Sequence, residues 1–160
     1  MSDEDRVLAR YEAAFDRLES GDAESPLPGR NAEEFASLLP DLERAAASGR
    51  ARCQAALATV LGFGLACRSE AEFQANAESL LLRATALWAE AASQGYWPSF
   101  DNLVTSGIGE EAEAARAIAA ELEVERSELI GRAGAMPVYG PAFMEEACRR
   151  YAAARAAQYL

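Results

Sequence analysis

Apolar residues recur along the chain every three or four positions, the spacing typical of amphipathic α-helices. In the first segment, 3–20, Leu8, Tyr11 and Leu18 fall on one face. Runs rich in glycine and proline separate the periodic segments, most clearly at 21–29 and 131–141. The pattern predicts further helices over 31–49, near 51–63, over 69–93, over 96–107 and over 110–130, and a last one from Pro141. We therefore expect an all-α protein of about seven helices.

Local signals predict where several of these helices begin and end. Asn31 and Ser69 are each followed three positions later by a glutamate, Glu34 and Glu72, which is the pattern of a capping box at a helix N-terminus. Proline inside a helix removes a backbone hydrogen bond, so we expect Pro40 to kink or split the second helix. Gly62 and Gly64 are expected to end the third helix, and Gly107 and Gly109 the fifth.

One short pattern occurs twice. An alanine pair precedes a glycine by three positions, and the glycine is followed by a small residue and then a leucine; the copies are Ala45-Ala46, Gly49, Cys53, Leu57 and Ala91-Ala92, Gly95, Ser99, Leu103. Glycine can end a helix in a left-handed conformation, and a small residue lets the next helix pack closely. Each copy predicts helix, tight turn, helix. A repeated unit of this kind predicts a helical array, an architecture that mostly binds other molecules.

The second copy resembles the Sel1-like repeat, a relative of the tetratricopeptide repeat, in a degenerate form. The resemblance is carried by Trp88, the pair Ala91-Ala92, Gly95, Ser99 and Asn102-Leu103, with Gly107-Ile108-Gly109 similar to the ending of the family's next helix. It covers roughly residues 42 to 109, and the two copies are spaced more widely than the family's repeats. The resemblance implies a short array of helical hairpins. We expect one domain over 1–160, with a repeat-like core over 31–131, an N-terminal helix and loop over 1–30, and a capping helix over 132–160.

The resemblance also implies a concave surface lined by the helices over 51–63 and 96–107. On it, Gln54, Phe100 and Asp101 are expected to face a bound partner, with Arg50 and Trp97 at the turns leading into the two helices. An apolar anchor beside a carboxylate is a mixture that protein interfaces favour. The alternative is that Trp97 and Phe100 fill the core between the helices. The resemblance makes Trp88 a core residue.

Two further regions are candidate partner contacts. Glu110 and Glu111 begin an acidic helix, which is either a solvated face or a negative surface that meets a basic partner. Tyr139 lies in an apolar connector, which either packs under the last helix or forms a contact patch.

The amino-acid composition excludes several kinds of catalytic and metal-binding site. The chain has no histidine and all 15 of its basic residues are arginine, which removes the Ser-His and Cys-His pairs, Schiff-base lysines and imidazole metal ligands. Three cysteines without metal-like spacing predict reduced structural thiols, and we expect no metal and no cofactor. Without strong catalytic chemistry, we expect a protein that is not an enzyme.

Charge points to the kind of partner. The formal net charge is −11, and no cluster of arginines exceeds Arg149-Arg150, so nucleic acid and anionic membranes are poor partners. A basic protein is the natural complement, although many proteins are this acidic for solubility alone. The acidic N-terminus has no apolar signal core and no apolar run could span a membrane, so we expect a cytoplasmic protein. Its oligomeric state is left open.

These observations predict a protein-binding helical array. Its sharper form is a cytoplasmic immunity protein, or antitoxin, that neutralises a basic toxin by direct binding, a role known for proteins of the resembled fold type. The alternative is a regulatory or assembly scaffold of the Sel1-like kind. A third class is a carboxylate-dependent enzyme or small-ligand binder, in which Asp101 and Glu110 would act.

Overall fold

The computed structural model describes residues 1–20, 29, 31–133 and 140–158 of the chain. Within these residues it contains seven α-helices and no strand, as the hydrophobic pattern predicts. The helices are α1 (Asp3–Ser20), α2 (Ala32–Ala47), α3 (Ala51–Gly62), α4 (Glu70–Ser93), α5 (Trp97–Ser106), α6 (Glu110–Ala133) and α7 (Pro141–Gln158). The all-α fold class is therefore confirmed.

The two glycine turns have the predicted geometry. Gly49 and Gly95 both adopt left-handed backbone conformations, with φ of 85° and 88°. At the second turn, the N–H of Gly95 donates to the carbonyl of Ala92 and that of Tyr96 to the carbonyl of Ala91, which satisfies the last carbonyls of α4. A Cβ on either glycine would meet open space, so these positions need glycine for its backbone freedom and not for room.

One helix start follows its sequence signal and one does not. The Ser69 hydroxyl accepts from the N–H of Glu72 at 3.1 Å, so Ser69 caps α4 as predicted. Asn31 precedes α2 but makes no side-chain cap, because its backbone is left-handed (φ 53°) whereas a capping residue normally has an extended backbone. The predicted capping box at Asn31 is therefore wrong.

Pro40 does not divide the second helix. The chain is one continuous α-helix over Ala32–Ala47, so of the two predicted outcomes, a kink or a split, the split is wrong. Pro40 and Ala36 are both exposed, and the Ala36 carbonyl, which loses its intrahelical donor, can be hydrated on that side.

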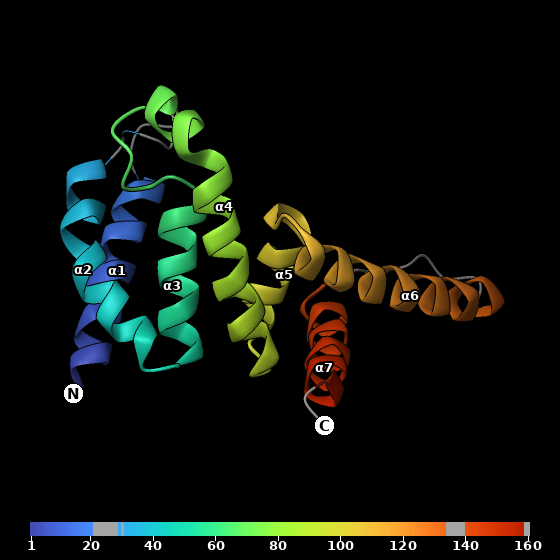
Figure 1. Ribbon diagram of the computed structural model, residues 1–160. Coiled ribbons are helices and arrows are strands. Elements are labelled where there is room, and N and C mark those ends of the chain that lie inside the picture. Colours follow the sequence, from blue (N-terminus) through green and yellow to red (C-terminus); the bar gives the residue numbers. More distant parts are fainter. Residues whose placement is uncertain (21–28, 30, 134–139, 159–160) are drawn as a thin grey trace.

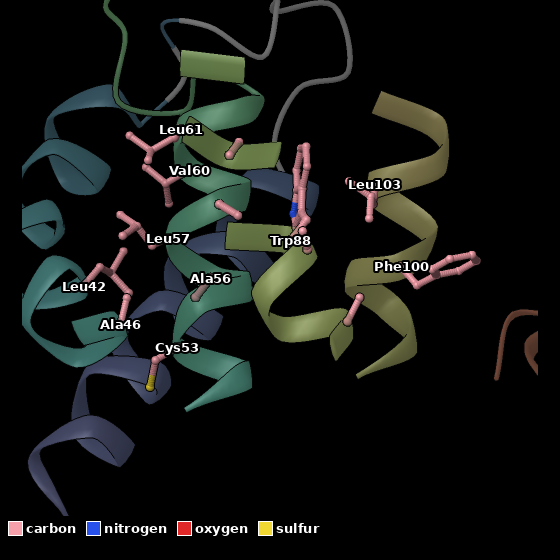
Figure 2. Packing of buried hydrophobic residues seen from close by; sticks show 14 of the residues in the cluster. Leu42, Ala46, Cys53, Ala56, Leu57, Val60, Leu61, Trp88, Phe100 and Leu103 are labelled. Carbon is pink, nitrogen blue, oxygen red and sulfur yellow. The ribbon is translucent and has the colours of Figure 1, made fainter. Parts of the chain in front are cut away.

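The core runs between the helices of the two hairpins (Figure 2). Trp88 of α4 is fully buried, as predicted, and its ring lies 5.9 Å from that of Phe63. On the other side of α3 the core is built from Leu42 of α2 and Leu57 of α3. The apolar stripes of the sequence therefore meet at the α2–α3 and α3–α4 contacts.

The helices are arranged in two layers. α1 contacts α3, α3 contacts α5 and α5 contacts α7, whereas the backbones of α2 and α4 do not approach each other closely and the two helices are joined through the ion pair of Arg83 with Glu43. Neighbouring helices of a curved array are closest on its inner side, so α1, α3 and α5 form the inner layer of the first five helices. Beyond them α6 extends away from the other helices, with α7 packed against α4, α5 and α6 (Figure 1).

Candidate functional site on the inner layer

A pocket of about 120 Å³ lies where the three inner helices meet. Its lining comes from each of them: Leu8, Tyr11 and Glu12 of α1, Arg52, Ala55, Ala56 and Thr59 of α3, and Tyr96, Pro98, Ser99 and Asn102 at the start of α5. The pocket is thus built by residues far apart in sequence. It lies on the same two helices, α3 and α5, that the repeat pattern assigns to a concave surface.

Ser99 is the most deeply buried of the polar residues that line this pocket. It sits in the first turn of α5, four residues after the glycine turn, and its side chain is fully buried. Its hydroxyl oxygen has no hydrogen-bond partner among the described residues. Cys53 holds the corresponding position in the first hairpin and is also fully buried, but it does not line the pocket. The two repeat copies therefore differ at this position in polarity and in their surroundings.

The aromatic wall of the pocket includes Tyr11, which is half-buried between α1 and α3. Burial raises the pKa of Tyr11 to about 12, and a hydrogen bond with Thr59 acts weakly in the opposite direction. The Thr59 hydroxyl also donates to the carbonyl of Ala55 at 2.9 Å. The phenol is therefore neutral at physiological pH and serves as a hydrogen-bonding group, not as a base.

Ion pairs join α1 to α3 along the inner layer. Arg52 donates to Glu12 at 2.5 Å at the rim of the pocket, and both side chains are 53% exposed. Arg50, at the turn leading into α3, donates to Asp5 at 2.7 Å. The Arg50 guanidinium and the Ser2 hydroxyl hold the pKa of Asp5 at about 2, well below its usual value. Arg50, a predicted partner contact, is thus engaged with α1.

Gln54 is placed differently from the sequence expectation. Its side chain is buried and does not face an open groove. The Gln94 amide donates both to Gln54 Oε1 at 2.9 Å and to the carbonyl of Gly49 at 2.8 Å. Gln54 therefore belongs to a bridge that joins the first repeat turn to the second, and the expectation that it faces a partner is corrected.

Phe100 follows the alternative in which it fills the core, and the expectation that it faces a partner is corrected. Its side chain is fully buried (Figure 2), and its ring lies 5.7 Å from that of Tyr151 on α7. The reason is that α7 covers the face of α5 that the repeat pattern leaves open. Trp97 is half-buried and packs against the core, while Asp101 is partly exposed on α5. Of the predicted apolar anchor, Phe100 is inaccessible, whereas Trp97 is partly exposed like the carboxylate of Asp101.

The acidic start of α6 lies apart from the pocket. Glu110 is exposed, whereas Glu111 accepts a hydrogen bond from the Tyr151 hydroxyl at 2.6 Å and lies 3.8 Å from Arg155 Nε. Glu111 thereby ties α6 to α7. Tyr139 lies outside the described residues.

Sequence reasoning did not find the residues that line the pocket. Tyr11 was predicted as part of an apolar helix face and Ser99 as a packing position. The signal that was present is the exchange of Cys53 for Ser99 between the copies, which puts a hydroxyl where the first hairpin has a weakly polar thiol. Part of the pocket lining comes from α1, a helix outside the repeat pattern, so the pattern cannot predict the pocket.

Within the described residues, no group of three or more His, Cys, Asp or Glu side chains is arranged to hold a metal ion. No helix in the same part of the chain is long and apolar enough to cross a membrane. Comparison of the chain with protein-family models, curated proteins and solved structures found no match. The relation to Sel1-like repeats therefore rests on the residues quoted above and stays a prediction.

Proposed function

We propose that this chain binds another protein through the inner layer formed by α1, α3 and α5, and that the partner is basic. The observation that carries the proposal is the pocket at the junction of the three helices, because a recess bounded by residues of several helices is a common place for a partner's side chain. The architecture supports it too, since curved helical arrays present extended concave binding surfaces.

Charge supports a basic partner. The net charge of −11 attracts cationic surfaces over several ångströms and repels acidic competitors. On the inner layer itself, Asp101 is partly exposed on α5 and Glu12 is exposed on α1. Glu12 lines the pocket and provides a local counter-charge there, and Asp101 adds a carboxylate on α5.

In its sharper form, the proposal is that binding neutralises the partner, as an immunity protein neutralises a toxin. Small size, high negative charge and the scarcity of catalytic groups support that form. A scaffold would use the same surface without blocking its partner's activity. The two roles are therefore separated by the partner's activity in the complex and not by the binding itself.

The test uses the whole chain as bait in an extract of its native host, followed by purification of the captured protein and measurement of the affinity. We expect a basic partner whose affinity falls as salt rises, because screening weakens an interaction between opposite charges. Asp101→Asn on the inner layer should weaken binding by up to about fivefold. Glu78→Gln on α4, with an exposed side chain outside that layer, is the charge-matched control and should leave the affinity unchanged.

Four results would contradict all or part of the proposal. An acidic partner, or an affinity independent of salt, removes the electrostatic argument. Equal effects of Asp101→Asn and Glu78→Gln remove the inner layer as the binding surface. A partner that keeps full activity in the complex ends the immunity form and leaves the scaffold form.

A further inference from the structure

The pocket on the inner layer contains a polar group that the fold leaves unsatisfied. Nearly all buried hydroxyls in proteins have a hydrogen-bond partner, because an unpaired one has lost water without replacement. Ser99 Oγ is fully buried, lines the pocket and has no partner among the residues described. The pocket wall therefore contains a hydroxyl whose hydrogen-bonding capacity no described residue uses.

The volume of the pocket limits the size of the group that can bind there. One water needs a cavity of about 10–15 Å³ on this kind of measure, so about 120 Å³ is room for much more than a single water. The volume is smaller than that of a drug-sized ligand site, which starts at about 300 Å³. The terminal group of an amino-acid side chain, with a few non-hydrogen atoms, fits a volume between these two limits.

The residues that line the pocket indicate the chemistry of the group that binds there. Oxygen atoms that accept hydrogen bonds are supplied by Ser99, Asn102 and the Glu12 carboxylate, and aromatic rings by Tyr11 and Tyr96. A guanidinium has only donors, is planar and stacks on aromatic faces. Apolar atoms of Leu8 and Pro98 in the same lining suit the methylenes of an arginine side chain.

The guanidinium of Arg52 already lies at the rim of the pocket. Glu12 pairs with Arg52 of the same chain at 2.5 Å, and both side chains are about half exposed. Such exposed pairs contribute little to stability and open readily. The carboxylate can therefore exchange its internal arginine for an external one without disturbing the fold.

We propose that this pocket is a recognition site for the guanidinium group of an arginine side chain on the basic partner. The site rests on the proposed function, since the arginine is taken to belong to that partner. The guanidinium pairs with Glu12, stacks on the tyrosine rings and donates toward Asn102 and Ser99. Arg52 then turns outward into solvent.

The pocket is tested on the isolated chain, without any partner. Arginine amide is titrated into labelled protein and followed by NMR, with citrulline amide as the uncharged analogue of nearly equal shape. We expect arginine amide to shift the resonances of Tyr11, Tyr96, Ser99 and Asn102 in a saturable way, with the weak affinity of a small fragment. Citrulline amide should cause no saturable shift at these residues.

Two pairs of variants assign the contact. Glu12→Gln should weaken arginine amide binding roughly tenfold, because it removes a charged acceptor, and Ser99→Ala should weaken it by a few-fold. Cys53→Ala changes the corresponding buried position of the other hairpin, and Glu78→Gln changes an exposed carboxylate outside the inner layer. Both controls should bind arginine amide as the parent chain does.

The outcomes separate this site from the proposed function. Absence of a saturable shift means that the pocket holds water only, and equal shifts with citrulline amide mean that it does not select a guanidinium; either result overturns the site. If a basic partner is captured equally by the parent, Glu12→Gln and Ser99→Ala, the site is overturned while the function stands. If arginine amide binds as expected and no basic partner exists, the site stands while the function fails.

Discussion

At the scale of single residues, close contacts explain positions that look like simple helix breakers in the sequence. Gly62 is the last residue of α3 and sits beneath the Trp88 ring of α4. A Cβ at Gly62 would lie 2.6 Å from Trp88 Cη2 and 3.0 Å from the Ala84 Cβ. Its backbone is not left-handed, so glycine is needed here for space. This close approach is what lets α4 lie against α3 with a fully buried indole between them.

Replacing this glycine tests the contact. Gly62→Ala should lower the free energy of unfolding by about 1–3 kcal/mol, because the added methyl forces the buried Trp88 ring or the α3–α4 contact to move. Urea unfolding followed by Trp fluorescence measures the change. Gly140→Ala is the matched control: its Cβ meets open space and its backbone is not left-handed. Equal stabilities of the two variants would show that Trp88 does not depend on the space at Gly62.

At the scale of elements, the two helical hairpins are joined through their turns as well as through their apolar faces. Gln94 closes α4, and its side chain reaches back to the carbonyl of Gly49 and to Gln54 of α3. Equivalent points of the two repeat copies are thereby in direct contact. The bridge thereby ties the end of α4, just before α5, to α3 and to the turn that precedes it.

Loss of this bridge should destabilise the array. Gln94→Ala leaves the buried Gln54 amide without its partner, which we expect to cost about 1–3 kcal/mol in the free energy of unfolding. In the double variant with Gln54→Ala the second substitution should cost less than it does alone, because the shared interaction is already gone. Gln74→Ala removes an exposed side chain that bonds only within α4, to Glu70, and should change stability by less than about 0.5 kcal/mol. Strictly additive effects of Gln94→Ala and Gln54→Ala would rule out the bridge.

At the scale of the whole molecule, the chain is an array in which each helix contacts mainly its neighbours. Stability in such arrays is distributed along the stack, and terminal units open first. α7 is held at its end by contacts with α4, α5 and α6, including the pairing of Tyr151 with Glu111. α3 instead lies in the interior, between α1, α2, α4 and α5. The two regions should therefore open with different free energies.

The reactivity of two buried cysteines measures this difference in the free energy of opening between α7 and α3. Cys148 of α7 and Cys53 of α3 are both inaccessible, and burial raises the pKa of the Cys148 thiol to about 11, so each reacts only when its region opens. In variants that retain only Cys148 or only Cys53 of the three cysteines, labelling of Cys148 should be roughly tenfold or more faster than labelling of Cys53 under native conditions. The same variants in denaturant, where the two thiols should react at similar rates, are the control. Equal native rates would mean that the array opens as one unit.

The sequence by itself determined where the helices lie. The three- and four-residue spacing of apolar positions marked all seven segments, and the glycine turns at Gly49 and Gly95 and the cap at Ser69 followed local signals, because such features depend only on residues within one or two turns. Trp88 was recognised as core from the repeat resemblance and is fully buried.

Only the tertiary structure decided which helix faces remain exposed to solvent. Phe100 is covered by α7 and Gln54 is engaged by Gln94, although both were expected to face a partner. Ser99 lines a pocket whose other walls come from α3 and from α1, which is outside the repeat pattern. The physical reason is that periodicity shows which side of a helix is apolar, whereas the identity of the helix that covers each side depends on contacts between residues far apart in the chain.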